Sequence, residues 1–295
     1  MKQDCVDPAK KQQERMGTIR YSIFDPTGNI TALVSDSVPV PKQPAVAAKI
    51  MRHHPAVEQV GFVTFPQPAE SGCLPELRMA GGEFCGNASM CAAAFYAFSL
   101  EQAGEDEPER VLLRVSGANE PVEVKLKRKD ETGWSAGVKL PPALSVGSVE
   151  LAWNDIGASL PLVRMEGISH LIIGTESPFF ALKEDREAAG QAVKIWCEAC
   201  QAPGLGMMFL EEADGGYHLT PLVYIPGGDT LFWENSCASG SAATGILLAA
   251  RSGHAADLTL QEPGGILRVQ SDPAGRETWL FGKASLLGQH ILQAG

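Results

Sequence analysis

Two cysteines of this chain lie in the same kind of position, directly before a run of small residues that leads into an apolar helix. Cys85 lies in "GGEFCGNASMCAAAF" (residues 81–95), and Cys237 lies in "WENSCASGSAATGILLAA" (residues 233–250). The first turn of a helix presents free backbone N–H groups and the positive end of the helix dipole. Both features favour a thiolate, lower its pKa and bind anions such as a carboxylate. We therefore predict two functional thiols at helix N-termini.

Two such helix ends on either side of one carboxylate would suit stereoinversion at the neighbouring carbon. One thiolate removes the proton, and the opposite thiol returns a proton to the other face. The helix N-termini and the exclusion of water would stabilise the carbanion, so we expect no metal and no other cofactor. The backbone at Gly86–Asn87 and at Ala238–Ser239 is expected to hold the carboxylate.

Hydrophobic periodicity and turn residues predict the elements that position these cysteines. In the first half we expect strand–turn–strand over 20–36, a helix over 42–54, a strand over 59–65, the Cys85 helix to about residue 102 and strands to 140. In the second half we expect strands near 160–183, a helix over 185–201, strands near 205–234 and then the Cys237 helix. Each half is mostly strands with one helix of small residues. The pattern indicates a gene-duplicated α+β protein.

The domain boundaries follow from the same reading. Residues 1–16 are polar and read as a disordered leader. An N-terminal domain is expected over 17–145, completed by 282–295, and a C-terminal domain over 146–281. "PPALSVG" (141–147) is expected to cross between them.

Composition excludes several classes of partner. The chain has 295 residues, a formal net charge of −11 and no dense basic block beyond "KLKRK", so nucleic acid and anionic membrane are not expected partners. Its apolar runs are too short to span a bilayer. Seven cysteines form no disulfide framework, which favours reduced thiols in a cytoplasmic protein.

The pair of cysteine motifs resembles the diaminopimelate epimerase superfamily, and the resemblance covers most of the chain. Three further segments resemble the family: "PTGNITALV", "VEQVGFV" and "EGISHLII". They imply substrate-site roles for Asn29, Gln59 and His170. The family consists of cofactor-independent amino-acid racemases and epimerases, usually homodimeric. The resemblance therefore implies two pseudo-symmetric domains, each a mostly antiparallel curved sheet or barrel around a central helix, with Cys85 and Cys237 as the acid/base pair.

Departures from the family pattern concern the part of the site that clamps the distal end of diaminopimelate. Ile168, Met79 and Met208 stand where the family has asparagines, and the family's Trp-Glu-Arg is missing. A charged group buried against these side chains would cost several kcal/mol. The chain thus looks more like a diverged branch that includes the histidine racemase of nicotianamine-like metallophore synthesis. Histidine, or another amino acid with a single stereocentre, is the expected substrate.

Polar groups near the second cysteine could orient such a side chain. Glu234, Asn235 and Tyr224 are the candidates, and Glu234 is counted among the substrate-binding residues. His170 can equally well be a packing residue, and Glu234 could be a solvated charge. Cys197 and Cys200 form a lone C-x-x-C without a second pair, which favours helix packing over a metal site.

Three alternatives stay open. The first is diaminopimelate epimerase itself. The second is an isomerase of the phenazine-biosynthesis type, although that group lacks the thiol pair. The third is a non-catalytic module that holds an amino acid on the same helix ends.

Overall fold

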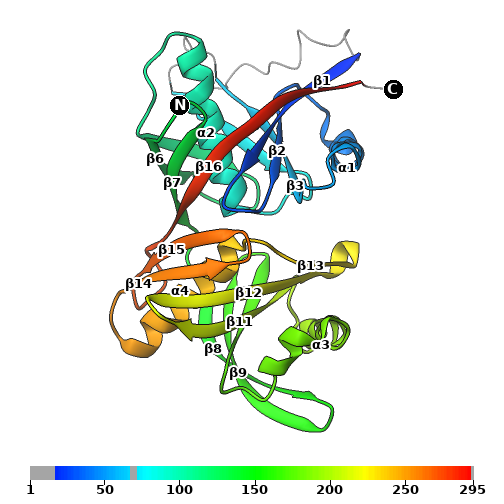
Figure 1. Ribbon diagram of the computed structural model, residues 1–295. Coiled ribbons are helices and arrows are strands. Elements are labelled where there is room, and N and C mark those ends of the chain that lie inside the picture. Colours follow the sequence, from blue (N-terminus) through cyan, green and yellow to red (C-terminus); the bar gives the residue numbers. More distant parts are fainter. Residues whose placement is uncertain (1–16, 67–71, 294–295) are drawn as a thin grey trace. The chain divides into compact units, whose positions relative to one another are not determined.

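The computed structural model describes residues 17–66 and 72–293, and the predicted leader lies outside the described residues. The chain divides into two compact units (Figure 1). Unit 1 comprises the chain up to Val138 together with the segment from Lys283 onward. Unit 2 comprises Lys139–Gly282. Each unit is described by itself.

Unit 1 is an eight-stranded barrel. Its strands are β1 (Thr18–Asp25), β2 (Thr31–Val34), β3 (Gln59–Thr64), β4 (Glu76–Met79), β5 (Arg110–Val115), β6 (Val122–Arg128), β7 (Gly133–Leu140) and the second half of β16 (Thr278–Gln293). Neighbouring strands pair in the order β1-β2-β3-β4-β5-β6-β7-β16. Because β1 also pairs with β16, the sheet closes on itself.

Helix α2 (Gly86–Gln102) is the buried helix of unit 1. Met90, Cys91 and the three alanines that follow are all buried, although consecutive residues face different sides of a helix. A helix that is apolar all round needs cover on every side. Strands β2, β5 and β6 pack against α2, and its small side chains allow this close approach. The second helix, α1 (Gln43–His53), packs on β3 with an apolar face that includes Ala47 and Ile50.

Unit 2 is a second strand-rich unit. It contains β8 (Ser145–Trp153), β9 (Ile156–Met165), β10 (Ile168–Gly174), β11 (Leu205–Ala213), β12 (Gly216–Ile225), β13 (Thr230–Trp233), β14 (Ala256–Glu262), β15 (Gly265–Ser271) and the start of β16. The strand order is β16-β15-β14-β12-β11-β10-β9-β8, with β13 on β12. The pairings β10–β11 and β12–β14 are parallel.

Helix α4 (Ala238–Ser252) occupies the concave side of this sheet. It contacts β14 and β15 as well as β8 and β9, which lie toward the other end of the strand order. The sheet must therefore curve around α4. Helix α3 (Arg186–Ala199) packs in a separate cluster around Trp196, which also includes Phe179 and Phe209. The pseudo-symmetry of the two halves stays a prediction.

Most predicted elements are present, with one correction. Residues 145–147, expected to cross between domains, already belong to β8, which precedes the strands expected from about residue 160. Val146 of β8 is exposed, so β8 lacks the clean alternation that predicts a strand. Among the described residues, the helices are all too short or too polar for a bilayer span.

Candidate functional site

Cys85 caps the N-terminus of α2. Its backbone is extended (φ −138°, ψ 115°), and its sulfur accepts a hydrogen bond from the N–H of Ala88 at 3.4 Å. The N–H and the hydroxyl of Ser89 both donate to the Cys85 carbonyl, at 3.0 and 2.7 Å. These contacts place the sulfur in the first helical turn, as the sequence predicts.

A chain of hydrogen bonds joins the Cys85 thiol to the predicted site residues of unit 1. The thiol donates to Gln59 Oε1 at 3.0 Å, and Gln59 Nε2 donates to Thr31 Oγ1 at 2.7 Å. The Thr31 hydroxyl in turn donates to the carbonyl of Asn29 at 2.9 Å. Asn29 and Thr31 are buried. The structure thus brings Asn29, Gln59 and Cys85 together, and a neutral amide faces the thiol.

Cys237 caps the N-terminus of α4 in a related way. Its backbone is also extended (φ −119°, ψ 100°), and its carbonyl accepts the N–H of Ser241 at 2.9 Å. The sulfur makes no cap hydrogen bond that matches the one at Cys85, and the hydroxyl of Ser239 lies 3.8 Å from it. Instead, the backbone N–H of Cys237 donates to Glu262 Oε2 at 2.7 Å.

The first two helical residues after each cysteine are those predicted to bind a carboxylate. They are Gly86 and Asn87 in α2, and Ala238 and Ser239 in α4. The first N–H groups of a helix have no intrahelical acceptor. Each helix start therefore retains the geometry of an anion site, next to a sulfur atom.

The electrostatic setting of Cys237 differs from the one predicted. Burial raises its pKa well above the ordinary value, and the carboxyl groups of Glu234 and Glu262 raise it further. The N–H of Gly240 opposes this rise but does not overcome it. The expectation that the helix start lowers the pKa is thus wrong for Cys237. Its sulfur is held as a thiol, which is the form that donates a proton.

Glu262 is a neighbour of Cys237 that the sequence analysis did not single out. It is only 2% exposed, and its other carboxyl oxygen accepts a hydrogen bond from Ser241 Oγ. Burial raises its pKa to about 8, against the lowering effect of the hydrogen bonds from Ser241 and the Cys237 N–H. A signal was present: along β14, Glu262 shares the inward face with Leu260, where an acidic residue is unusual.

Glu234 and His170 are the remaining predicted site residues of unit 2. The Glu234 carboxyl group interacts with the Cys237 thiol. His170 on β10 is fully buried, and within the described residues neither ring nitrogen has a hydrogen-bond partner. Burial lowers its pKa to about 3, so the ring is neutral.

Apolar side chains lie beside the sulfur of Cys237. A Cβ atom added at Gly240 would lie 2.1 Å from Met208 Sδ and 3.1 Å from Cys237 Sγ. A Cβ atom added at Gly206 would lie 2.3 Å from His170 Nδ1 and 2.7 Å from Met208 Cε. Met208 therefore lies between the imidazole of His170 and the first turn of α4. In unit 1 Met79, another predicted departure from the family, is also fully buried.

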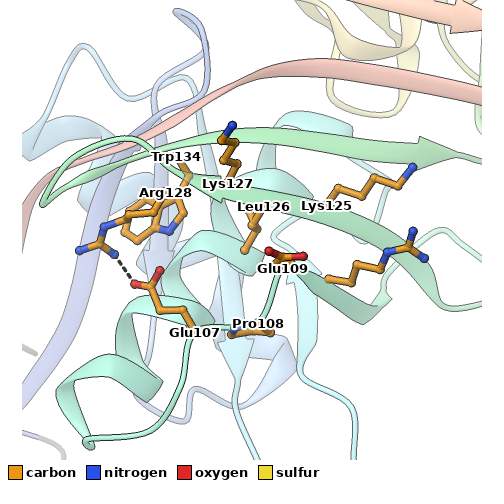
Figure 2. A pocket seen from close by; sticks show the side chains of 9 residues that line it. Glu107, Pro108, Glu109, Lys125, Leu126, Lys127, Arg128 and Trp134 are labelled. Atoms are coloured by element: carbon orange, nitrogen blue, oxygen red, sulfur yellow. Dashed lines mark hydrogen bonds and ion pairs between the residues drawn. The ribbon is translucent and has the colours of Figure 1, made fainter.

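Other cysteines and one pocket lie apart from these two networks. Cys197 and Cys200 are buried in the core of unit 2, consistent with helix packing. The expectation of reduced thiols agrees with the five described cysteines that are free, whereas Cys73 is disulfide-bonded. A pocket of about 610 Å³ in unit 1, lined by residues 107–110, 125–128 and Trp134, contains none of the predicted site residues (Figure 2).

Comparisons with known proteins agree with these features. The family model "Histidine racemase CntK N-terminal domain" matches residues 18–279. A histidine racemase from Staphylococcus aureus is 28% identical over 255 residues, covering 86% of this chain and 88% of that protein. A histidine racemase from Fusobacterium nucleatum is 30% identical over 232 residues, covering 76% of this chain and 79% of that protein. The crystal structure of a hydroxyproline epimerase from Agrobacterium vitis has the same fold, with a TM-score of 0.65 at 13% identity. The match covers 94% of this chain and 92% of that structure.

Proposed function

Because this chain belongs to the CntK histidine racemase family and is an isomerase of the amino-acid racemase class, we propose that it interconverts the enantiomers of histidine, with Cys85 and Cys237 as its acid/base pair. One observation carries the proposal: each cysteine caps a buried helix, so a sulfur atom lies beside a helix N-terminus, which attracts anions. Such a pair of caps supplies two proton-transfer groups and two carboxylate sites.

The proposed reaction moves one proton off the α-carbon and another onto its opposite face. One cysteine, as a thiolate, takes the α-proton, and the electron pair stays on the carbon next to the carboxylate. The other cysteine, as a thiol, delivers its proton to that carbon. The two sulfurs have then exchanged protonation states, so the enzyme is ready for the reverse direction.

The two thiols suit different first roles. The carboxyl groups beside Cys237 favour its protonated form, which supports Cys237 as the proton donor. Cys85 is partly exposed and donates its hydrogen bond to a neutral amide. We therefore propose that Cys85 acts as the base in the first turnover of the free enzyme.

The proposed substrate follows from apolar side chains that stand where the family has polar ones. Met79 and Met208 are buried and cannot pair with a second amino-acid head group. A flat imidazole matches apolar walls with a few polar groups, and Asn29, Gln59, Glu234 and His170 are the proposed contacts. The relatives of this family carry the name histidine racemase.

Proton exchange in D₂O tests the function directly. The protein is incubated with L-histidine, with other single L-amino acids and with LL-diaminopimelate, and the products are analysed by chiral chromatography and mass spectrometry. We expect deuterium at the α-carbon of histidine and both enantiomers in the product. The Cys85→Ala and Cys237→Ala variants should lose racemisation, whereas Cys197→Ala, a core cysteine of unit 2, serves as the matched control.

Two outcomes would contradict the proposal. Conversion of LL- to meso-diaminopimelate, without activity on histidine, would favour the epimerase alternative. Exchange with none of these amino acids, together with measurable binding of one of them, would favour a non-catalytic module.

We propose that no cofactor takes part. The purified protein should be colourless and should keep its activity in EDTA. Loss of activity on dialysis, restored by zinc or pyridoxal phosphate, would contradict this. We further propose a cytoplasmic homodimer that serves metallophore synthesis, and light scattering of the purified protein tests the dimer.

A further inference from the structure

Glu262 is a buried carboxyl group that the proposed proton transfer does not itself use. We propose that Glu262 is a positioning residue for Cys237, which fixes the first turn of α4 and sets the protonation of the thiol there. The racemisation part of this inference rests on the proposed function. The contact with Cys237 does not, because it is a property of unit 2 alone.

The hydrogen bonds show how Glu262 acts on the helix start. At most helix N-termini the capping side chain itself accepts an N–H of the first turn. The Cys85 sulfur does so in α2, whereas in α4 the N–H of Gly240 interacts with the Cys237 sulfur without the geometry of a cap hydrogen bond. Glu262, from the end of β14, supplies an acceptor for the N–H of Cys237 at 2.7 Å. Through this hydrogen bond, Glu262 connects the capping residue Cys237 to strand β14.

The serine four residues after each cysteine also donates to a different acceptor in the two helices. In α2 the hydroxyl of Ser89 donates to the carbonyl of Cys85 at 2.7 Å. In α4 the hydroxyl of Ser241 donates to Glu262. Glu262 thus spans one turn of α4, from Cys237 to Ser241. The turn after β14 is held as well, because the N–H of Gly264 donates to the Asn235 carbonyl at 2.7 Å.

The charge of Glu262 matters for an anionic substrate. Its ionisable neighbours are Cys237 at the start of α4 and Glu234 after β13. A neutral Glu262 leaves the N–H groups of Ala238 and Ser239 able to attract a carboxylate. An ionised Glu262 would repel that carboxylate and would also hold the proton on Cys237 more tightly. With a pKa of about 8, Glu262 changes form at mildly alkaline pH.

The experiment compares the wild type with Glu262→Gln, which keeps the size and an acceptor oxygen but removes the charge. Peptide mapping after alkylation reports the reactivity of Cys237 as a function of pH, without any substrate. We expect Cys237 of the variant to react at a pH lower by about one unit or more, which is about a tenfold rise at a fixed pH. Glu212→Gln, an exposed glutamate of unit 2, is the matched control and should leave this profile unchanged.

Racemisation kinetics give the second readout. The KM of the wild type should rise above pH 8, by up to about tenfold per pH unit, because the carboxylate binds only to the form with neutral Glu262. The KM of Glu262→Gln should lack this rise. A variant that matches the wild type in both the Cys237 reactivity profile and the KM profile would overturn the proposal. A shifted reactivity profile in a protein that racemises no amino acid would support the positioning role and contradict the proposed function instead.

Discussion

The thiol of Cys85 faces a neutral amide, whereas Cys237 is 4% exposed and has two carboxyl groups as neighbours. Alkylation requires the thiolate, so burial and nearby negative charge slow it. Of the five free cysteines that the structure describes, Cys85 alone is not fully buried. We therefore predict that iodoacetamide modifies Cys85 first, and mass spectrometry of the tryptic peptides measures the rates.

Histidine supplies the control for this prediction. Saturating substrate should slow the modification of Cys85, since the proposed site includes it, and should leave the slow reaction of Cys197 unchanged. Equal rates for Cys85 and the core cysteine Cys197 would contradict the assignment of Cys85 as the accessible base.

At the scale of residues, motifs and the family pattern pointed to residues that the structure places in one hydrogen-bonded network. Asn29, Gln59 and Cys85 come from three segments, and the structure joins them by hydrogen bonds. Glu262 belongs to no motif, and only the parallel pairing of β14 with β12 and the packing of α4 bring it to Cys237. The pKa of Cys237 could not be predicted either, because it depends on burial and on these neighbours.

At the scale of the elements, the packing of the start of α4 requires a glycine at position 240. A Cβ atom at position 240 would lie 2.1 Å from Met208 Sδ, well inside van der Waals contact. We predict that Gly240→Ala lowers the free energy of unfolding by about 1–3 kcal/mol and reduces racemisation, because the helix start must shift. Urea denaturation and initial rates measure the two effects.

A second substitution makes this prediction specific. Met208→Ala removes the clashing atoms, so the double variant should recover part of the activity that Gly240→Ala loses. Gly147→Ala is the matched control, because no atom lies within 4 Å of a Cβ there. No recovery in the double variant would mean that Met208 is not the obstacle.

Sequence periodicity predicted the helices better than the strands. The helices expected over 42–54 and 185–201 are found at Gln43–His53 and Arg186–Ala199. Their amphipathic pattern needs only local information. Strand β8 was not predicted, because its stability comes from pairing with β9 along its full length while several of its side chains are exposed. Barrel closure through β16 likewise depends on contacts between distant segments.

At the scale of the whole molecule, two buried groups with opposite pKa shifts shape the dependence of stability on pH. Glu262 keeps its proton up to about pH 8 when folded but ionises from an ordinary value of 4.5 when unfolded. The free energy of unfolding therefore falls as the pH rises from 4.5 to 8. His170 binds a proton below 6.5 when unfolded but only near 3 when folded, so stability falls as the pH drops from 6.5 to 3.

These two contributions cancel between pH 4.5 and 6.5 and add a loss of about 1.4 kcal/mol per pH unit on either side. We predict that Glu262→Gln removes the fall between 6.5 and 8, and that His170→Asn removes the fall below 4.5. Urea denaturation at pH 3.5, 5.5 and 7.5 measures both, as differences between the wild type and each variant. Parallel curves for wild type and variants would refute the assignment.

Strand β16 begins in unit 2, where Thr278–Phe281 pair with β15, and ends in unit 1, where Ser285–Gln293 pair with β1. On the ribosome, the residues of β1 thus emerge 260 to 275 residues before their partners in β16, from Asp25↔Ser285 to Thr18↔Gln293. Until then, β1 presents an unpaired edge that can join another chain. The barrel of unit 1 should therefore be completed only after β16 has left the ribosome. A nascent chain stalled before β16 should be cut readily by proteases within unit 1, and should depend on chaperones that shield exposed strands.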